Sequence, residues 1–211
     1  MSRSDALASL PKVFLIGFNK CGTRTIHYHF KANGIGAVHF DHGRLALSMF
    51  RNLTNSKPLL TGYENFTAFS DMEMINADFA FEAYKLYPYL SDQYPDSVFI
   101  LNTRNVEAWL QSRLKNSYGT YAQRWKRILK IREDEELLAA WRTDWAQHHD
   151  RVEDFFSRNK YRFFKFNIET DDPMTFNSGL PEFCLDARKY KVLGRTADEP
   201  ALDERVTTLG L

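Results

Sequence analysis

Glycine, lysine and threonine residues occur together in the segment Gly17–Thr25, which reads GFNKCGTRT. Its two glycines are five residues apart, so the backbone can turn sharply and aim its N–H groups inward. Lys20 adds a full positive charge, and Thr23 and Thr25 add hydroxyl donors. This combination is typical of a cradle for a phosphate or sulfate group. A tight strand-to-helix junction, in which the glycines serve only the turn, is the open alternative.

The segment differs from the phosphate-binding loop of nucleotide triphosphatases. That loop, G-x-x-x-x-G-K-[ST], has its lysine directly after the second glycine and then a hydroxyl residue that binds Mg²⁺. Here Lys20 comes two positions before Gly22, and Thr23 directly follows that glycine. The spacing therefore disfavours a small-molecule kinase, which stays as an alternative.

A second pair of candidate binding groups follows about 80 residues later. Arg104 comes directly after the run Ser97–Thr103, and Ser112 lies seven residues, or two helical turns, past Asn105. A guanidinium fork and a hydroxyl beside one groove can hold a second phosphate. Taken singly, each also fits a surface role: a strand-end arginine and a solvent-facing helix serine.

Three runs of mainly apolar residues predict strands that are buried on both faces: Lys12–Gly17, Ser97–Thr103 and Tyr161–Ile168. Weaker strand candidates are Ala37–Phe40 and Phe66–Ser70. Because the carboxyl ends of parallel strands meet at one edge of a sheet, the loop after the first strand and Arg104 are expected at the same edge.

Helical patterns fill the intervals between these strands. One follows the first strand and a second follows residues 97–103. The clearest covers about 134–158, where apolar residues form one stripe of period 3.6. Strands that alternate with helices predict an α/β fold whose central, mainly parallel sheet is covered on both faces.

Length and charge exclude several classes of protein. The chain has 211 residues, enough for one domain, and 28 basic against 27 acidic residues give a net charge of +1. Binding to nucleic acid through bulk charge is therefore not expected. The longest apolar run, Val13–Ile16, is far shorter than the ~20 residues of a membrane span. Segments 1–10 and about 196–211 are expected to be flexible.

The two cysteines, Cys21 and Cys184, have no metal-ligand spacing and cannot form a disulfide framework. The N-terminal residues also lack the long apolar centre of a secretory signal. A reducing cytoplasm is the expected location. The adjacent pair His148 and His149 would chelate a metal poorly, because neighbouring helical side chains point about 100° apart, and no metal site is expected.

The two motifs, in this order and at this separation, resemble those of sulfotransferases that use 3′-phosphoadenosine 5′-phosphosulfate (PAPS). Lys20–Arg24, KCGTR, is similar to the K-G-G-T-R loop of carbohydrate sulfotransferases. It departs from the K-S-G-T-T-W loop of the cytosolic small-molecule enzymes, because Thr25 stands in place of the tryptophan. Arg104 and Ser112, eight positions apart, resemble the family's 3′-phosphate site. The resemblance covers roughly residues 12–168 and implies a three-layer sandwich like that of P-loop NTPases.

The resemblance also implies a mechanism and a set of site residues. A sulfuryl group would pass from PAPS to a hydroxyl or amine of a small molecule or carbohydrate, without a metal. Lys20 would stabilise the charge that develops on the leaving oxygen. An inactive nucleotide-binding protein of the same fold is the alternative. The residues implied in nucleotide binding are Asn19, Lys20, Cys21, Gly22, Thr23, Arg24, Thr25, Arg104 and Ser112.

A general base is needed for an acceptor hydroxyl, and the family places it near the end of the strand between the two motifs. Asp71 is the best positional match, although a helix starting near Met72 would make it an N-cap instead. Other candidates for the base are Glu73, Glu64, His39 and His42.

Two further features near the motifs have alternative interpretations. Cys21 lies beside Lys20 at a helix start, where thiol pKa values tend to fall, but a small loop residue without redox chemistry is the simpler interpretation. The basic run of Lys189, Lys191 and Arg195 either closes over the nucleotide, as in family members, or forms a solvated face.

Overall fold

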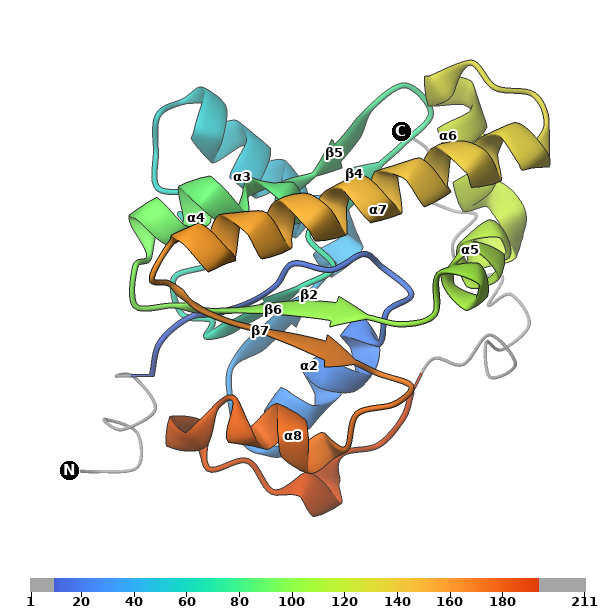
Figure 1. Ribbon diagram of the computed structural model, residues 1–211. Coiled ribbons are helices and arrows are strands. Elements are labelled where there is room, and N and C mark those ends of the chain that lie inside the picture. The colour runs from blue at the N-terminus through green and yellow to red at the C-terminus, as the bar shows by residue number, and fades with distance from the viewer. Residues whose placement is uncertain (1–9, 194–211) are drawn as a thin grey trace, which may run out of the picture.

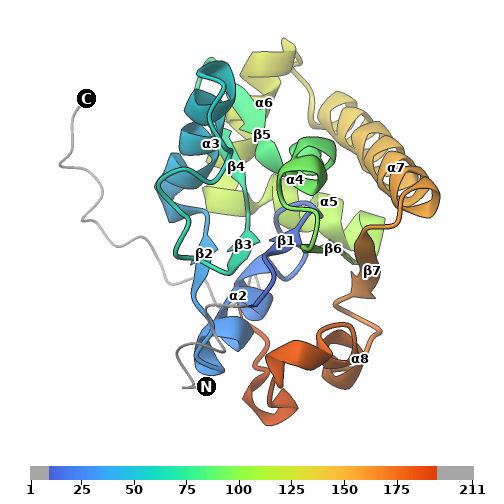
Figure 2. The same ribbon diagram turned by 90° about the vertical axis from the view of Figure 1, so that its left-hand side faces the viewer.

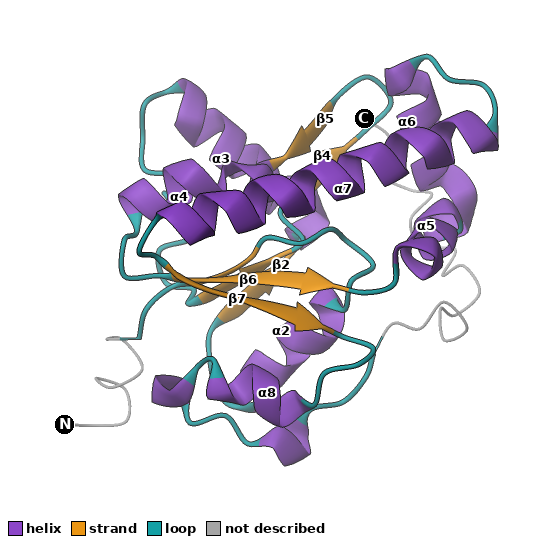
Figure 3. Cartoon of the chain, in the orientation of Figure 1, coloured by secondary structure: helices purple, strands orange, loops and turns teal. Residues whose placement is uncertain are grey.

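A computed structural model describes residues 10–193. Its central sheet has five strands in the order β2-β3-β1-β6-β7, and all neighbouring pairs are parallel (Figures 1 and 3). The strands are β1 (Val13–Leu15), β2 (Ala37–His39), β3 (Ala68–Ser70), β6 (Val98–Thr103) and β7 (Arg162–Asn167). A separate antiparallel hairpin is formed by β4 (Glu73–Ile75) and β5 (Ala80–Glu82).

Helices cover both faces of the sheet and make the fold a three-layer α/β sandwich (Figures 1 and 2). Helices α2 and α8 lie on one face, and α3, α4 and α7 lie on the other (Figure 2). The helices are α2 (Thr23–Ala32), α3 (Arg44–Thr54), α4 (Tyr87–Gln93), α5 (Val106–Leu114), α6 (Thr120–Leu129), α7 (Asp134–Arg158) and α8 (Pro173–Ser178). Short 3₁₀ turns lie at Asp41–Gly43, Ala83–Leu86, Asn116–Gly119, Pro181–Phe183 and Ala187–Lys189.

Alternate residues of the central strands enter two separate cores. On β1, Val13 and Leu15 pack toward α2 and α8, whereas Phe14 packs on the opposite face, and all three are 0 or 1% exposed. The apolar stripe of α7 supplies Trp141 and Phe156 to that second core. Burial on both faces explains why the strands read as nearly continuous apolar runs.

The strand β1 lies between β3 and β6, and this order sets the place of the binding site. After β1 the chain passes through α2 to β2, which lies to one flank of β1 within the sheet. β6 lies next to β1 on its other flank. In open parallel sheets such a reversal opens a crevice at the carboxyl ends of the strands. The loop after β1 and the start of α5 both lie at this edge (Figure 1).

The five predicted strands are present, and the long helix is confirmed with both of its predicted ends, 134 and 158. Burial on both faces is wrong for the third apolar run, because β7 is an edge strand in which only Phe166 is buried. The helix proposed to start near Met72 is wrong, because residues 73–75 pair with residues 80–82 in the β4–β5 hairpin. This hairpin, α3 and α6 were not predicted. Apart from Leu10, the ends expected to be flexible lie outside the described residues. Within residues 10–193, no helix has both the length and the apolar character to cross a bilayer.

Candidate active site

The loop after β1 is held in place from the neighbouring strand by Asn102, which is fully buried on β6. The Asn102 Oδ1 accepts from the Gly17 backbone N–H at 3.0 Å, and its Nδ2 donates to the Cys21 carbonyl at 3.0 Å. A Cβ on Gly17 would lie 1.9 Å from the Asn102 carbonyl oxygen, so only glycine fits there. Asn102 was missed from the sequence, although a polar residue inside a buried apolar run is a visible signal.

The far end of the same loop starts helix α2. Gly22 has φ 74°, and α2 begins at Thr23, so the free N–H groups of the first turn face the pocket edge of the sheet. Lys20 also adopts a left-handed conformation, with φ 59°. The Asn19 carbonyl accepts from the Trp109 Nε1–H at 3.1 Å, which ties the loop to α5. The contacts with Asn102 and Trp109 therefore hold the loop in one conformation.

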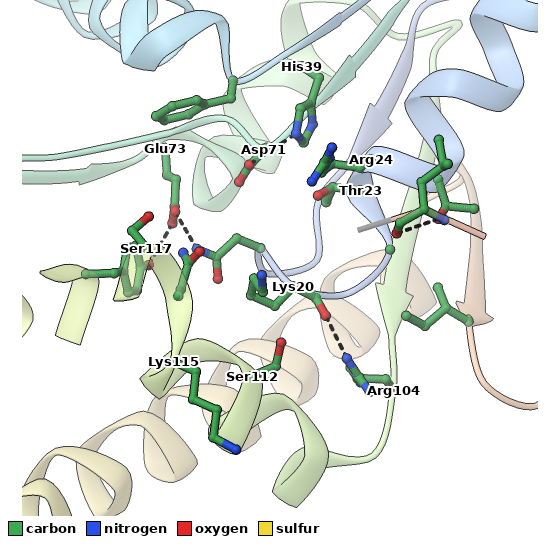
Figure 4. Close-up of a pocket in the computed structure, with 18 of the residues that line it drawn as sticks. Lys20, Thr23, Arg24, His39, Asp71, Glu73, Arg104, Ser112, Lys115 and Ser117 are labelled. Atoms are coloured by element: carbon green, nitrogen blue, oxygen red, sulfur yellow. Dashed lines mark hydrogen bonds and ion pairs between the residues drawn. The ribbon is translucent and has the colours of Figure 1, made fainter. Parts of the chain in front are cut away.

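A pocket of about 880 Å³ brings the predicted groups together (Figure 4). The Cys21 side chain, Glu64 and His42 do not line it, and burial raises the pKa of the Cys21 thiol far above its usual range. A reactive thiol is therefore not expected at Cys21. The sequence-predicted residues that line the pocket are Asn19, Lys20, Gly22, Thr23, Arg24, Thr25, His39, Asp71, Glu73, Arg104 and Ser112.

Arg104 lies at the carboxyl end of β6, as expected, and is already engaged. Its Nη1 donates to the Lys20 carbonyl at 3.2 Å, and its Nη2 lies 2.6 Å from Oε1 of Glu169, a residue that sequence reasoning missed. Ser112 lines the pocket one helix turn further along α5 than Trp109. The guanidinium and the hydroxyl thus reach the same pocket from one strand–helix unit.

Part of the C-terminal segment also borders the pocket. The Thr25 hydroxyl accepts from the Leu193 N–H at 2.9 Å, and Tyr190 and Val192 line the pocket beside it. Lys189 instead donates to the Ala32 carbonyl at 3.1 Å, at the C-terminal end of α2, where a cation is favourable. Lys191 is exposed and Arg195 lies outside the described residues, so the basic run itself is not placed on the pocket.

Asp71 follows β3 at the opposite side of the pocket from Arg104 (Figure 4). Its Oδ2 lies 3.5 Å from the His39 Nε2, and its Oδ1 is buried without a hydrogen-bond partner. Burial raises the pKa of the Asp71 carboxyl to about 6, although the positive charge of Lys20 opposes the rise. Burial likewise lowers the pKa of His39 to about 4, so the imidazole is neutral at pH 7. Asp71 has the pKa that a base operating near neutral pH requires.

Glu73, two residues further on, is held differently. Its Oε1 accepts from the Asn19 Nδ2 at 2.6 Å, and its Oε2 lies 3.1 Å from the Tyr121 hydroxyl. The buried guanidinium of Arg113 in turn donates to the Tyr121 oxygen at 2.7 and 3.1 Å. Burial first, and the charge of Asp71 second, raise the pKa of Glu73 to about 8. Both Glu73 oxygens are thus engaged in a buried network that supports the loop.

Strained backbone is concentrated around this pocket. Lys20, Phe40, Asp71 and Ser117 have φ values of 59°, 56°, 54° and 50°, and all four line it. Left-handed conformations are rare for residues other than glycine and persist only where the surrounding structure enforces them. Four such residues on one pocket make it the candidate functional site.

The two adjacent histidines of α7 have structural partners. The His148 Nε2 lies 2.7 Å from the Ile16 carbonyl, and the His149 Nε2 lies 2.9 Å from the Thr103 hydroxyl. Both are buried, and they point to different partners, as the helical geometry predicts. Over residues 10–193, no group of three or more His, Cys, Asp or Glu side chains could hold a metal ion.

Comparison with known proteins agrees with this geometry. A family model described as a sulfotransferase domain matches residues 12–169, which include the glycine loop, Asp71, Arg104, Ser112 and Glu169. No curated protein matches the chain. Because the family model covers well over half of the sequence, the chain belongs to the sulfotransferase domain family, whose members are enzymes that transfer a sulfuryl group.

Proposed function

We propose that the protein is a PAPS-dependent sulfotransferase that acts on a hydroxyl or amine of a small molecule or carbohydrate. One observation carries the proposal: the glycine loop with Lys20, the pair Arg104 and Ser112, and Asp71 all line a single pocket. A substrate with two phosphate groups and a transferable sulfuryl group matches these three sets of groups.

The donor would bind at the sheet edge. The loop N–H groups and the start of α2 would hold the 5′-phosphosulfate, and Arg104 with Ser112 would hold the 3′-phosphate. Thr23 and Arg24 line the pocket beside the loop and add a hydroxyl and a positive charge for the same anion. Asn19 and Cys21 would act through the backbone, because the Asn19 amide faces Glu73 and the Cys21 thiol is buried in the core.

The transfer itself needs a base and a charge stabiliser. Asp71 would take the proton of the acceptor hydroxyl, whose oxygen then forms the new bond to sulfur. The bond between sulfur and the bridging oxygen breaks, and its electron pair stays on the 5′-phosphate of the nucleotide. Lys20 would stabilise the negative charge on that oxygen, so the step as proposed uses no metal. His39, neutral and 3.5 Å from Asp71, would orient the carboxyl.

Asp71 is preferred to Glu73 as the base for two structural reasons. The buried Asp71 Oδ1 has no hydrogen-bond partner, whereas both oxygens of Glu73 are engaged by Asn19 and Tyr121. With a pKa of about 8, Glu73 already carries a proton at pH 7 and cannot take another from the acceptor. Glu64 and His42 do not line the pocket and are not proposed further.

Thermal-shift measurements separate this function from its alternatives. We expect 3′-phosphoadenosine 5′-phosphate (PAP) to stabilise the protein by about 2.7 kcal/mol at 100 times its Kd, and ATP–Mg²⁺ to do much less. A larger shift with ATP–Mg²⁺ would favour the kinase. Transfer of radiolabelled sulfate from PAPS is then assayed with a panel of alcohols, phenols, sugars and amines. Stabilisation by PAP, but no transfer to any acceptor or to water, would favour an inactive binding protein.

Two expectations about the whole chain remain proposals. We infer that residues 1–211 form a single catalytic domain, which limited proteolysis with and without PAP tests. We also infer a cytoplasmic location, which cell fractionation tests.

A further inference from the structure

Glu169 lies beside Arg104 because of the pairing of two neighbouring strands. β6 and β7 are parallel, with Thr103 opposite Asn167, and the Ile168 N–H continues the ladder by donating to the Thr103 carbonyl at 3.0 Å. The residues that follow the two strands therefore emerge together at the pocket edge. The position of the Glu169 carboxylate next to the Arg104 guanidinium follows from strand register rather than from a flexible loop.

The Glu169 carboxylate is fixed by three donors. Oε1 accepts from the Arg104 Nε at 3.0 Å and from its Nη2 at 2.6 Å, and Oε2 accepts from the Asn105 backbone N–H at 2.8 Å. Burial disfavours the ionised carboxyl, but the bonds from Asn105 and Arg104 outweigh burial and lower the pKa of Glu169. The Asn105 N–H holds Oε2 at the start of α5, so the carboxylate has a backbone partner in addition to Arg104.

The guanidinium of Arg104 has five N–H groups, and these contacts use three of them. Two are directed to Glu169, and one on Nη1 is directed to the Lys20 carbonyl at 3.2 Å. One N–H on Nη1 and one on Nη2 remain. Arginine that is free to rotate loses about 2 kcal/mol of rotamer freedom when it becomes fixed. Here that freedom is lost before any ligand arrives, which favours tight binding.

We propose that Glu169 is a positioning residue: it orients Arg104 so that its two remaining N–H groups select a nucleotide that carries a 3′-phosphate. The inference rests on the proposed function, since it assumes that the 3′-phosphate binds at Arg104. Through the Lys20 carbonyl, the same guanidinium also fixes the left-handed turn of the phosphate loop. Glu169 would thus align both phosphate sites although it binds neither phosphate itself.

Calorimetry with PAP and with AMP, which lacks the 3′-phosphate, tests the proposal. In Glu169→Ala we expect the ratio of the AMP Kd to the PAP Kd to fall about tenfold, which corresponds to about 1.4 kcal/mol. Glu169→Gln, which keeps an acceptor for the guanidinium, should recover part of the ratio. The matched control is Glu182→Gln. Glu182 is paired with Arg162 away from the pocket, with a side chain 30% exposed against 33% for Glu169, and its substitution should leave the ratio unchanged.

The direction of the change distinguishes positioning from simple repulsion. A carboxylate near a phosphate repels it, so a Glu169 that acted only by charge would give a higher ratio in both variants. This inference would be overturned by an unchanged or higher ratio in the Glu169 variants together with a ratio that collapses in Arg104→Ala. That result would leave the proposed function intact. A wild-type protein that binds PAP and AMP equally would overturn the 3′-phosphate assignment and this inference together. If Glu169→Ala does not fold, Glu169→Gln decides the question by the same criterion.

Discussion

The two ends of the pocket are built on opposite principles. We call the part of the pocket around the loop after β1 and Arg104 the donor end, because the sulfuryl donor would bind there. Its groups are fixed by their neighbours: Asn102 holds the loop, and Glu169 holds Arg104. We call the part of the pocket around Asp71 and Glu73 the acceptor end, because the acceptor molecule would bind there. Asp71 keeps a buried oxygen without a hydrogen-bond partner, and its carboxyl has a raised pKa. Hydrogen-bond donors that are held in place suit an anion whose charge does not change on binding. A general base, in contrast, must keep an oxygen available for a proton. The comparison teaches that binding and proton transfer need different degrees of hydrogen-bond satisfaction.

Asp71→Asn tests the acceptor end and should have the largest effect. The asparagine keeps the shape of the side chain but cannot accept a proton, so we expect kcat to fall by about 10²–10⁴. The melting temperature at pH 7 should be equal to or above that of the wild type, because asparagine removes the buried charge that raises the pKa of Asp71. The PAP affinity should stay close to that of the wild type, because Asp71 is not among the groups proposed to hold the nucleotide. Steady-state kinetics with an identified acceptor, together with PAP calorimetry, measure both.

The neighbours of Asp71 provide the controls for this test. If Asp71→Asn turns over normally while His39→Ala or Glu73→Gln is inactive, the base is one of those residues. In that case the orphaned oxygen at Asp71 would not mark the proton acceptor, and the contrast between the two ends would fail.

Lys20→Ala tests whether the donor end also contributes to catalysis. We expect a loss of about 10²–10³ in kcat, the size typical of one electrostatic stabiliser, with the fold intact. Lys20 contributes its backbone carbonyl to Arg104, and alanine keeps that carbonyl. Lys31→Ala, on the exposed part of α2, is a matched control and should leave kcat unchanged. A Lys20→Ala enzyme with wild-type kcat would limit the donor end to binding.

The presence of Lys20 and Arg104 in one pocket could be predicted from the sequence, because both residues come shortly after apolar strands. Lys20 and Arg104 lie just past β1 and β6, and parallel strands bring their carboxyl ends to one edge. Glu169 was missed because its role depends on the register between β6 and β7, which periodicity does not reveal. An acidic residue is also not expected at a site for anions.

The acceptor end was harder to predict for a physical reason. Glu73 is joined to Asn19 and Tyr121 across 54 and 48 residues of chain, so its state depends on how α6 packs against the hairpin. The N-cap interpretation of Asp71 failed because it used local preference alone. Residues 73–75 instead satisfy their backbone groups by pairing with residues 80–82, which overrides that preference.

Glu73→Gln tests the network between the two ends through the pH dependence of stability. Burial and the Asp71 charge raise the pKa of Glu73 from 4.5 to about 8, so the folded protein keeps a proton that the unfolded chain releases. The stability that this proton contributes is complete below pH 4.5 and is lost as the pH rises through about 8. The variant cannot ionise at this position.

Its melting temperature should therefore rise relative to that of the wild type as the pH increases from 4.5 to 8. We expect a relative change of about 10 °C, since each pH unit between the two pKa values changes the stability by about 1.4 kcal/mol, and about 1 kcal/mol shifts the midpoint by roughly 2–4 °C for a protein of this size. If the melting temperatures of the variant and the wild type instead change in parallel with pH, Glu73 is ionised in the folded protein. Glu73 would then compete with Asp71 as the base, and the unpartnered Asp71 oxygen would no longer distinguish the acceptor end.

Gly22→Ala, compared with Gly34→Ala, tests how rigidly the donor end is preset and should have the smallest effect. Both glycines are left-handed, with φ 74° and 82°, so each substitution costs about 1–2 kcal/mol of backbone strain. A Cβ on Gly34 would meet nothing within 4 Å, but one on Gly22 would lie 2.8 Å from the Ile168 Cγ2. We therefore expect urea unfolding to show an additional loss of about 1 kcal/mol for Gly22→Ala, the lower end for overpacking. PAP affinity should fall only in that variant, because Ile168 directly precedes Glu169 and its displacement would disturb Arg104. Equal losses of stability in the two variants would mean that the Ile168 side chain moves aside at no cost. The segment directly after β7 would then not restrict the conformation of the loop.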